Sequence, residues 1–530
     1  MVVIGLFFTF CLTFVITGFM LYVAMVTGIG PWVAPVIGVI VQGISNCFAN
    51  ETVKRLGLIV TVSSSVGGII GVAFGFSFPT WFFLDKQGFS SVLDHKFYFL
   101  LICASLVMIA GIIGIACSSF FYKDLVEKEK LPFPVGVMTH NSVMQDNPRE
   151  RRYLYSGMGT YFLYSIFFIK RLWGTYALPL THTFYKGFSS WYIAVPAFTS
   201  DFSVMPLLIS IGFVAGSIMA VPLMCGVALK MTCVTWLYNY YSSLSYSSFL
   251  FALCSGIVVS GTVGSLLSQG YSLLQGSCSA VSSTLFSYDA IYSAYERYKS
   301  FVPWGIIFVA YSYWYGFSIL GAVYIFIATI VCAYQLSFIA GKIGLALLGR
   351  FATFVMVPGM LVFGWNPLQV TLVATFVELV GGVAVDSLQG KKALQLSGVH
   401  PKDYSLYQYI ALCAASCAIA LFFYYFITYY ELGSSVLCVQ RAQARALLLQ
   451  VTTVDMGVLG WGVIIGLLLK RFSCNPVLVL SGLLMDFSLL FPLILGGIGA
   501  LYSKKHSHYE PFFSGVYVAN ACGSILAMFL

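Results

Sequence analysis

Long apolar runs separated by short polar segments dominate the chain. A helix that crosses the hydrocarbon core of a bilayer needs about 20 residues, and most of these runs are that long. In the first part of the chain we expect spans at 4–26, 29–46, 57–80, 97–121, 153–170, 204–230 and 248–270. In the second part we expect them at 304–338, 343–364, 367–388, 405–430, 452–470, 476–502 and 511–530. The pattern predicts an all-α polytopic membrane protein of about 14 transmembrane helices, up to about 16 if the stretch 171–203 contributes more.

Three short motifs recur in the same order in both parts of the chain. They are Thr61-x4-Val66-Gly67-Gly68 and Thr375-x4-Val380-Gly381-Gly382, Pro206-x15-Pro222 and Pro476-x15-Pro492, and Ser255-Gly256-x2-Val259 and Ser514-Gly515-x2-Val518. Such self-similarity indicates two homologous halves. We expect a first transmembrane repeat at 1–270 with a hydrophilic loop at 122–152, a linker at 271–302 and a second repeat at 303–530. Secondary transporters often place their binding site between repeats of this kind.

Composition and charge agree with a membrane protein. Hydrophobic residues make up 59% of the chain and charged residues 8%, with a mean hydropathy of +0.91, so no soluble core can cover this apolar surface. With the N-terminus taken as cytoplasmic, most Lys and Arg residues fall in cytoplasmic loops, which favours an inverted second half. We expect the protein in the plasma or bacterial inner membrane. The net charge of +9 lies mostly in loops beside lipid headgroups and needs no nucleic-acid partner. The 14 cysteines lack CxxC spacing, so we expect no disulfide framework, metal site or cofactor.

Several collinear motifs resemble the oligopeptide transporter (OPT) family and its yellow-stripe-like branch. They are Thr27-Gly28-x2-Pro31, Asn50-Glu51-Thr52-Val53, Leu131-x-Phe133-Pro134-x-Gly136 and Asp386-x2-Gln389-x2-Lys392-x3-Leu396-x4-Pro401-Lys402. The resemblance covers most of the chain. It implies proton-coupled uptake, by alternating access, of small peptides or of metal bound to peptide-like chelators.

Acidic residues inside the apolar runs are the candidates for proton coupling. A charge at the centre of a spanning helix costs about 2.5–3.5 kcal/mol on insertion scales, so such a residue is functional unless it is paired. Glu378 and Asp486 lie in the middle of their runs, and Glu51 opens another run. The alternative for Glu378 and Asp486 is a structural ion pair, and for Glu51 it is a role at a helix N-terminus.

Further polar residues are candidates for the substrate pathway. Asp386 follows Glu378 by a little over two helical turns and lies about 80° from it around the axis, so both can border one cavity. The resemblance adds Gln389, Lys392 and Asp201, while Lys391 and Lys392 also suit positive-inside anchors. Asn50 opens a span and is alternatively a helix cap. His140 and Asn141 follow the proline-kinked segment 131–136 and either line an entrance or lie on the surface.

Two other functions remain open from the sequence. A siderophore-like importer would carry metal chelates but no free peptides. A membrane-embedded enzyme is disfavoured because the chain has no HExxH or GxSxG motif. In each transport hypothesis the partners are a small solute, protons and the lipid bilayer, with a homodimer as a further possibility.

Overall fold

The structure is a computed structural model that describes most of the chain. The described residues are 2–27, 30, 32–46, 51–144, 148–168, 206–215, 217–241, 246, 249–250, 252–254, 256–257, 302–434, 437, 439–451, 455–471, 479, 482–483, 487–503 and 506–526. Within them the chain is helical and contains no strand, as the sequence predicts. Asn50, Asp201, Asp486 and the stretch 171–203 lie outside the described residues, as does nearly all of the expected linker.

The helices of the first part of the chain are α1 (Val2–Thr27), α2 (Ala34–Asn46), α3 (Glu51–Ser77), α4 (Thr80–Leu84), α5 (Lys86–Asp94), α6 (Lys96–Tyr122), the π-helical turn η1 (Lys123–Lys128), α7 (Pro134–Met144), α8 (Pro148–Phe168), α10 (Pro206–Ala215), α11 (Ser217–Leu229), the π-helical turn η3 (Lys230–Val234) and α12 (Thr235–Tyr240). Those of the second part are α15 (Val302–Trp314), α16 (Ile319–Ile343), α17 (Leu348–Phe363), α18 (Pro367–Leu396), α19 (Pro401–Tyr429), α20 (Gln440–Val451), α21 (Met456–Arg471), α23 (Phe487–Tyr502) and α24 (His506–Leu526).

The length and composition of the helices make this a membrane-embedded protein. In the described part, 6 helices are long and apolar enough to cross a bilayer, and shorter apolar helices accompany them. Large apolar side chains also cover the outside: Phe97 is 91% exposed, Leu320 76% and Phe7 70%. An apolar surface of this extent is stable in contact with lipid rather than water.

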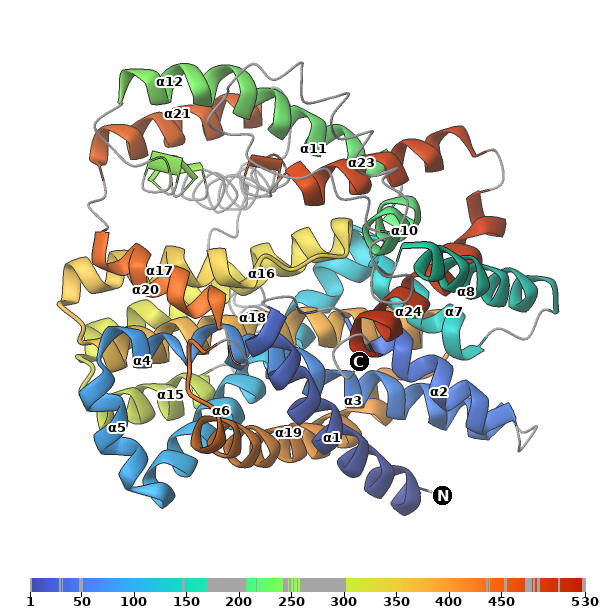
Figure 1. Cartoon of the computed structure of the whole chain (residues 1–530), viewed down its shortest axis with the longest axis horizontal. Helices are drawn as coiled ribbons and strands as arrows, with labels where there is room; N and C mark the ends of the chain where they lie inside the picture. The colour runs from blue at the N-terminus through green and yellow to red at the C-terminus, as the bar shows by residue number, and fades with distance from the viewer. Residues whose placement is uncertain are drawn as a thin grey trace, which may run out of the picture.

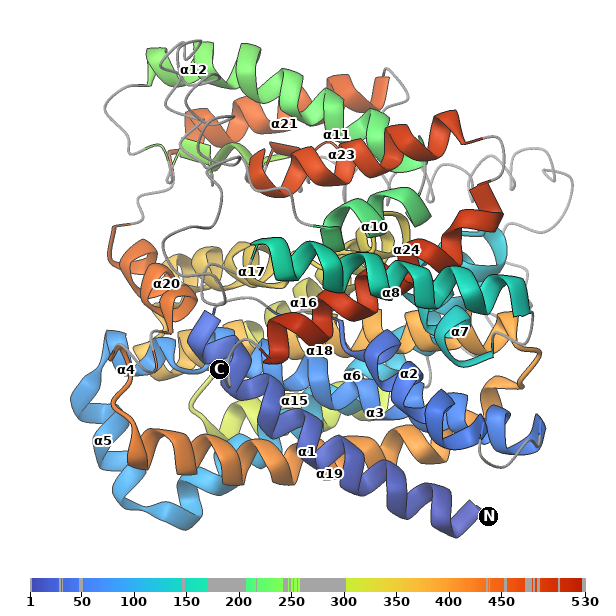
Figure 2. The same cartoon turned by 45° about the vertical axis from the view of Figure 1, so that its right-hand side comes forward.

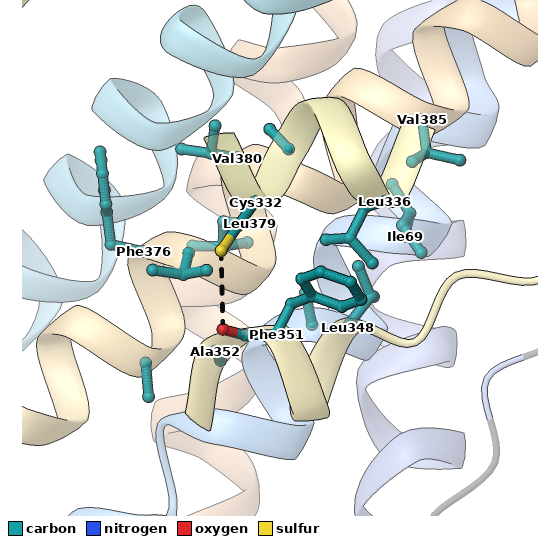
Figure 3. Packing of buried hydrophobic residues seen from close by; sticks show 14 of the residues in the cluster. Ile69, Cys332, Leu336, Leu348, Phe351, Ala352, Phe376, Leu379, Val380 and Val385 are labelled. Atoms are coloured by element: carbon teal, nitrogen blue, oxygen red, sulfur yellow. Dashed lines mark hydrogen bonds between the residues drawn. The ribbon is translucent and has the colours of Figure 1, made fainter. Parts of the chain in front are cut away.

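Helices α3 and α18 cross antiparallel at the centre of the molecule (Figures 1 and 2). Along the crossing, Val62 lies beside Gly390, Ser65 bonds to Asp386, and Ile69 lies beside Gly382. The crossing point falls at the repeated Val-Gly-Gly motifs, where the missing side chain of Gly382 leaves room for Ile69. Figure 3 shows Ile69 packed with Leu336 and Leu348, so α16 and α17 close over the same point.

The helices form two bundles. The core bundle consists of α1–α7 and α15–α20, packed around α3 and α18. The outer bundle consists of α8, α10–α12, α21, α23 and α24, and part of it forms a separate layer at the top of both views (Figures 1 and 2). Each bundle takes helices from both parts of the chain. Helices from the two parts of the chain are therefore interleaved in space rather than placed side by side.

Glycines bring the helices of the outer bundle into backbone contact. A Cβ atom on Gly212 of α10 would lie 2.2 Å from the carbonyl oxygen of Leu493 in α23, and one on Gly496 would lie 2.2 Å from that of Ile209. Gly226 of α11 and Gly482 face each other in the same way, with a Cβ on Gly226 2.7 Å from the Cα of Gly482. As residue numbers rise on one helix they fall on its partner, so these helices run antiparallel.

Two short helices begin with the same unusual backbone conformation. Phe133 precedes α7 with φ 47° and donates its N–H to the carbonyl of Gly341 at the end of α16, at 2.7 Å. Val439 precedes α20 with φ 43° and donates its N–H to the carbonyl of Met25 near the end of α1, at 2.8 Å. A non-glycine residue with positive φ is uncommon. The two hydrogen bonds fix where α7 and α20 start.

Three sequence predictions need correction. The expected span 304–338 is two helices, because Gly316 turns the chain with φ 77° and Ser318 accepts a capping bond from Gly321 N–H at 3.1 Å. The expected spans 29–46 and 343–364 become α2, of 13 residues, and α17, of 16 residues, each shorter than the roughly 20 residues of a full span.

The prediction of a hydrophilic loop at 122–152 is also wrong over much of that range. Its middle forms α7, in which Val135 and Met138 are fully buried, and its end starts α8. Helix α7 has only 11 residues and is flanked by charged residues on both sides, so its apolar run is too short to be recognised in the sequence as a span.

The glycine contact between α8 and α24 gives a stability prediction. A Cβ on Gly157 would lie 2.0 Å from the carbonyl oxygen of Phe512, so Gly157→Ala must push the helices apart. We expect a loss of about 1–3 kcal/mol, read as a lower melting temperature of the purified protein in detergent. Gly159→Ala on the same helix is the control, because a Cβ there meets nothing within 4 Å. Equal melting temperatures for the two variants would contradict this packing.

Candidate functional site

Helix α18 carries the largest group of buried polar and charged residues described in the protein. The helix starts at a capping box, in which Asn366 and Gln369 exchange side-chain and backbone hydrogen bonds, with Pro367 in the first turn. It ends at Ser397, before the left-handed Gly398. Between these ends the buried polar residues are Thr371, Thr375, Glu378, Asp386, Ser387, Gln389 and Lys391. Polar groups held inside a membrane bundle mark a solute or proton pathway or a structural network.

Glu378 forms a buried ion pair with Arg445 of α20. The carboxyl group is fully buried and Arg445 is 6% exposed. Arg445 also donates to the hydroxyl of Ser77, at the end of α3, at 2.7 Å and to the carbonyl of Gly349, in α17, at 3.4 Å. The second oxygen of Glu378, Oε2, is buried without a hydrogen-bond partner among the described residues. The pair thus ties four helices together.

Asp386 lies in a separate polar cluster between α3, α18 and α19. Its carboxylate accepts a hydrogen bond from the hydroxyl of Ser65 at 2.8 Å, and the residue is 2% exposed. Tyr404 of α19 lies against Gly390, about one turn further along α18, and its hydroxyl lies 3.3 Å from the carbonyl of Val62. Glu378 and Asp386 share a helix but have different partners. The structure therefore does not bring them into contact.

Gln389 and Lys392 of α18 both lie against the first turn of α7. The side-chain oxygen of Gln389 accepts the N–H of Gly136 at 2.8 Å, which satisfies one of the free amides of the first turn of α7. A Cβ on Gly136 would lie 2.5 Å from the carbonyl oxygen of Gln389 and 3.3 Å from the Cβ of Lys392. These two residues of α18 thus hold the proline-kinked segment 131–136 in place.

Lys391 is buried inside the protein rather than anchored at its surface. Its ammonium group donates to the hydroxyls of Ser118 and Ser119 on α6, at 3.0 and 2.9 Å, and lies 6.0 Å from the ring centre of Tyr122. The sequence favoured a positive-inside anchor at this position. The structure instead uses the lysine to join α18 to α6.

His140 and Asn141 lie on α7, close to the end of α18. The ring nitrogen Nδ1 of His140 is 2.7 Å from the hydroxyl of Ser397, which in turn donates to the carbonyl of Ala393 at 3.0 Å. Asn141 is half-buried. Glu51 is the first residue of α3, while the position of its side chain is outside what the structure describes.

The sequence analysis missed Arg445, the partner of Glu378. Arg445 stands between Ala444 and Ala446 in a short run that leads into Leu447, and α20 has only 12 residues. A single arginine between alanines is only weak evidence in the sequence that the residue is buried. It points to an ion pair only when the partner acid is known.

Comparisons with known proteins add no family assignment. No family model matches the chain, and no curated protein matches it significantly. Among the described residues no group of three His, Cys, Asp or Glu side chains gathers that would hold a metal ion.

The Glu378–Arg445 pair gives a second stability prediction. Arg445→Leu leaves the carboxylate buried without its cation, so we expect a loss of about 3–5 kcal/mol. The double variant Glu378→Leu/Arg445→Leu removes both charges and should recover most of the melting temperature in detergent. Arg441→Leu, on the exposed side of α20, is the control: its guanidinium lies over the ring of Phe76, 4.2 Å from the centre, and losing this contact should cost about 0.5–1 kcal/mol, well below the loss for Arg445→Leu. A double variant no more stable than Arg445→Leu would contradict the pairing.

Proposed function

We propose that this protein is a secondary active transporter with two homologous, inverted halves and 14 to 16 spans (about 20 residues per full span). It takes up small peptides or peptide-like metal chelates together with protons, by alternating access. It lies in the plasma or bacterial inner membrane with its N-terminus in the cytoplasm. The OPT resemblance supplies the solute class and the coupling ion, while the helix geometry supports the mechanism.

The observation that carries the proposal is a set of reciprocal contacts between repeated positions. Gly226 and Gly496 are 270 residues apart (496 minus 226), and so are Gly212 and Gly482 (482 minus 212). Gly212 contacts the α23 backbone near Gly496, and Gly226 contacts Gly482. Reciprocity of this kind is what a two-fold axis produces. Because the related helices run antiparallel, the axis is perpendicular to them, which corresponds to opposite orientations of the two halves in a membrane.

The order of the helices supports the same relation. Helices α1, α2 and α3 have 26, 13 and 27 residues, and α16, α17 and α18 have 25, 16 and 30. The short helix starts at residue 34 in one set and at 348 in the other, an offset of 314 (348 minus 34) that equals the offset between the Val-Gly-Gly motifs. The matching hydrogen bonds of Phe133 and Val439 extend this agreement to α7 and α20.

Short helices that start inside the bundle provide the means of binding a solute. The loops before α2 and α17 touch, since Trp32 Nε1 donates to the carbonyl of Gly344 at 2.9 Å, and α7 starts beside the same glycine. Helix N-termini carry partial positive charge and free N–H groups, which favour carboxylates. Transporters use such interrupted helices near the bilayer midplane. A peptide or a chelate with carboxylate groups is therefore the class of solute that suits these termini.

The two bundles provide the means of movement. The most extensive helix–helix contacts lie within each bundle, and the contacts that link one bundle to the other are much smaller. Among the links, Tyr517 of α24 donates to the carbonyl of Trp32 at 3.0 Å, next to the start of α2. Movement of the outer bundle against the core bundle would therefore reach the short helices directly.

Uptake into proteoliposomes tests the proposal. We expect saturable uptake of radiolabelled di-, tri- or tetraalanine, or of an iron(III) amino-carboxylate chelate, that increases when an inward proton gradient is imposed. Protein-free liposomes and liposomes treated with a protonophore are the controls. Each proton that moves inward contributes about 2.3 kcal/mol per 100 mV, so uphill accumulation is the decisive measurement.

The same assay separates the alternatives. Uptake of the chelate without any peptide would support the siderophore-like importer. Chemical conversion of a peptide without its movement into the liposome would support a membrane-embedded enzyme. Uptake that is unaffected by the proton gradient would contradict proton coupling.

A further inference from the structure

The two buried acids of α18 differ in their access to a positive charge. Glu378 contacts the guanidinium group of Arg445. In the described part of the chain, no basic side chain lies within ion-pair distance of Asp386. A carboxylate buried without a cation is unfavourable, and binding a proton removes the charge. Glu378, in contrast, is stabilised as a carboxylate by its partner.

Neutral groups surround Asp386. Ser65 of α3 donates to the carboxyl group and lies 3.0 Å from the carbonyl of Val62. Tyr404 is a titratable side chain of α19 that lies against the neighbouring turn of α18, at Gly390, and it is 1% exposed. Ser387, the next residue on α18, accepts from the amide of Gln408 on α19. The Ser65 hydroxyl can donate to the carboxylate or accept from the protonated acid, so it serves both protonation states without adding charge.

Three buried or partly buried basic groups on α18 and its neighbouring helices are engaged elsewhere. Lys391, on α18 itself, is directed at the serines of α6. Lys342 of α16 lies over the ring of Phe338, 4.5 Å from its centre. On α7, His140 is bonded to Ser397. None of these contacts supplies a counter-charge to Asp386.

We propose that Asp386 is the group that carries the coupled proton, and that the Glu378–Arg445 pair is a fixed structural tie. The proposal rests on the proposed transport function. Asp386 is protonated while it is enclosed, as in this structure, with Ser65 and Tyr404 around it. Release of the proton leaves a carboxylate that needs water, so the α3–α18–α19 interface must open to one side of the membrane. Proton binding and the enclosed state are linked in this way.

Carbodiimide labelling tests proton binding without a substrate. Dicyclohexylcarbodiimide is apolar and reacts with protonated carboxyl groups in membrane interiors. We expect the purified wild-type protein, in detergent across a pH series, to be modified at Asp386 and not at Glu378, as read by mass spectrometry of its peptides. Labelling of Asp386 should fall as pH rises. Preferential labelling of Glu378, or none at Asp386 at any pH, would overturn the proposal.

Two substitutions test coupling in proteoliposomes loaded with trialanine. With one proton per solute, an inward gradient of about one pH unit supports about tenfold accumulation by the wild type. Asp386→Asn mimics the protonated acid, so it should keep exchange of labelled for unlabelled trialanine but lose accumulation. Asp386→Glu keeps a titratable group and should restore part of it. Wild-type accumulation by Asp386→Asn would contradict the assignment.

The two readouts distinguish this inference from the proposed function. If the wild type moves no trialanine and no iron chelate, transport of these solutes fails, while the labelling pattern still decides whether Asp386 binds the proton. If the wild type accumulates trialanine but Asp386 is not labelled, the transport function stands and the assignment of the proton to Asp386 is wrong. Gel filtration of each variant in detergent verifies that it is folded.

Discussion

The structure depends on one constraint: a polar group inside hydrocarbon must find its partner within the protein. Helix α18 carries several such groups, and each one selects a neighbouring helix. Glu378 selects α20 through Arg445, Asp386 selects α3 through Ser65, and Lys391 selects α6. Apolar packing alone would not distinguish these neighbours, because lipid tails are as apolar as the helix faces. The polar residues of one helix thus determine much of the arrangement of the core bundle.

In the outer bundle, glycines determine which helices pack together. Without a hydrophobic driving force between helices in lipid, close van der Waals contact has to hold them together, and small residues permit that contact. Gly157 and Gly515 place α8 and α24 in backbone contact, and Gly256 and Gly462 repeat the arrangement between the segment 252–257 and α21. The glycines that hold the bundle together include Gly212, Gly226, Gly482 and Gly496, whose reciprocal contacts support the proposed relation between the two parts of the chain.

The two acids of α18 suggest how a static framework and a moving proton can share one helix. An acid paired with an arginine that also bonds to two further helices is suited to hold the four together, since separating the pair would leave two charges in a low-dielectric interior. An acid among neutral hydrogen-bonding groups can change its charge without breaking an ion pair. In the proposed transporter Glu378, through Arg445, joins α17 and α20 to α3 and α18, and Asp386 carries the proton. The two acids differ in role because Arg445 pairs with Glu378 and not with Asp386.

The sequence by itself determined the membrane class, the helical fold and most of the long helices, because the length of an apolar run and the hydrogen-bonding demands of lipid act locally. It also pointed to Glu378 and Asp386, since buried acids are conspicuous in an apolar run. Only the tertiary structure decided that α7 is a buried helix, that α15 and α16 are separate, and that Arg445 neutralises Glu378. These depend on contacts between residues far apart in the chain, such as the 67 positions between Glu378 and Arg445, and no local pattern encodes them.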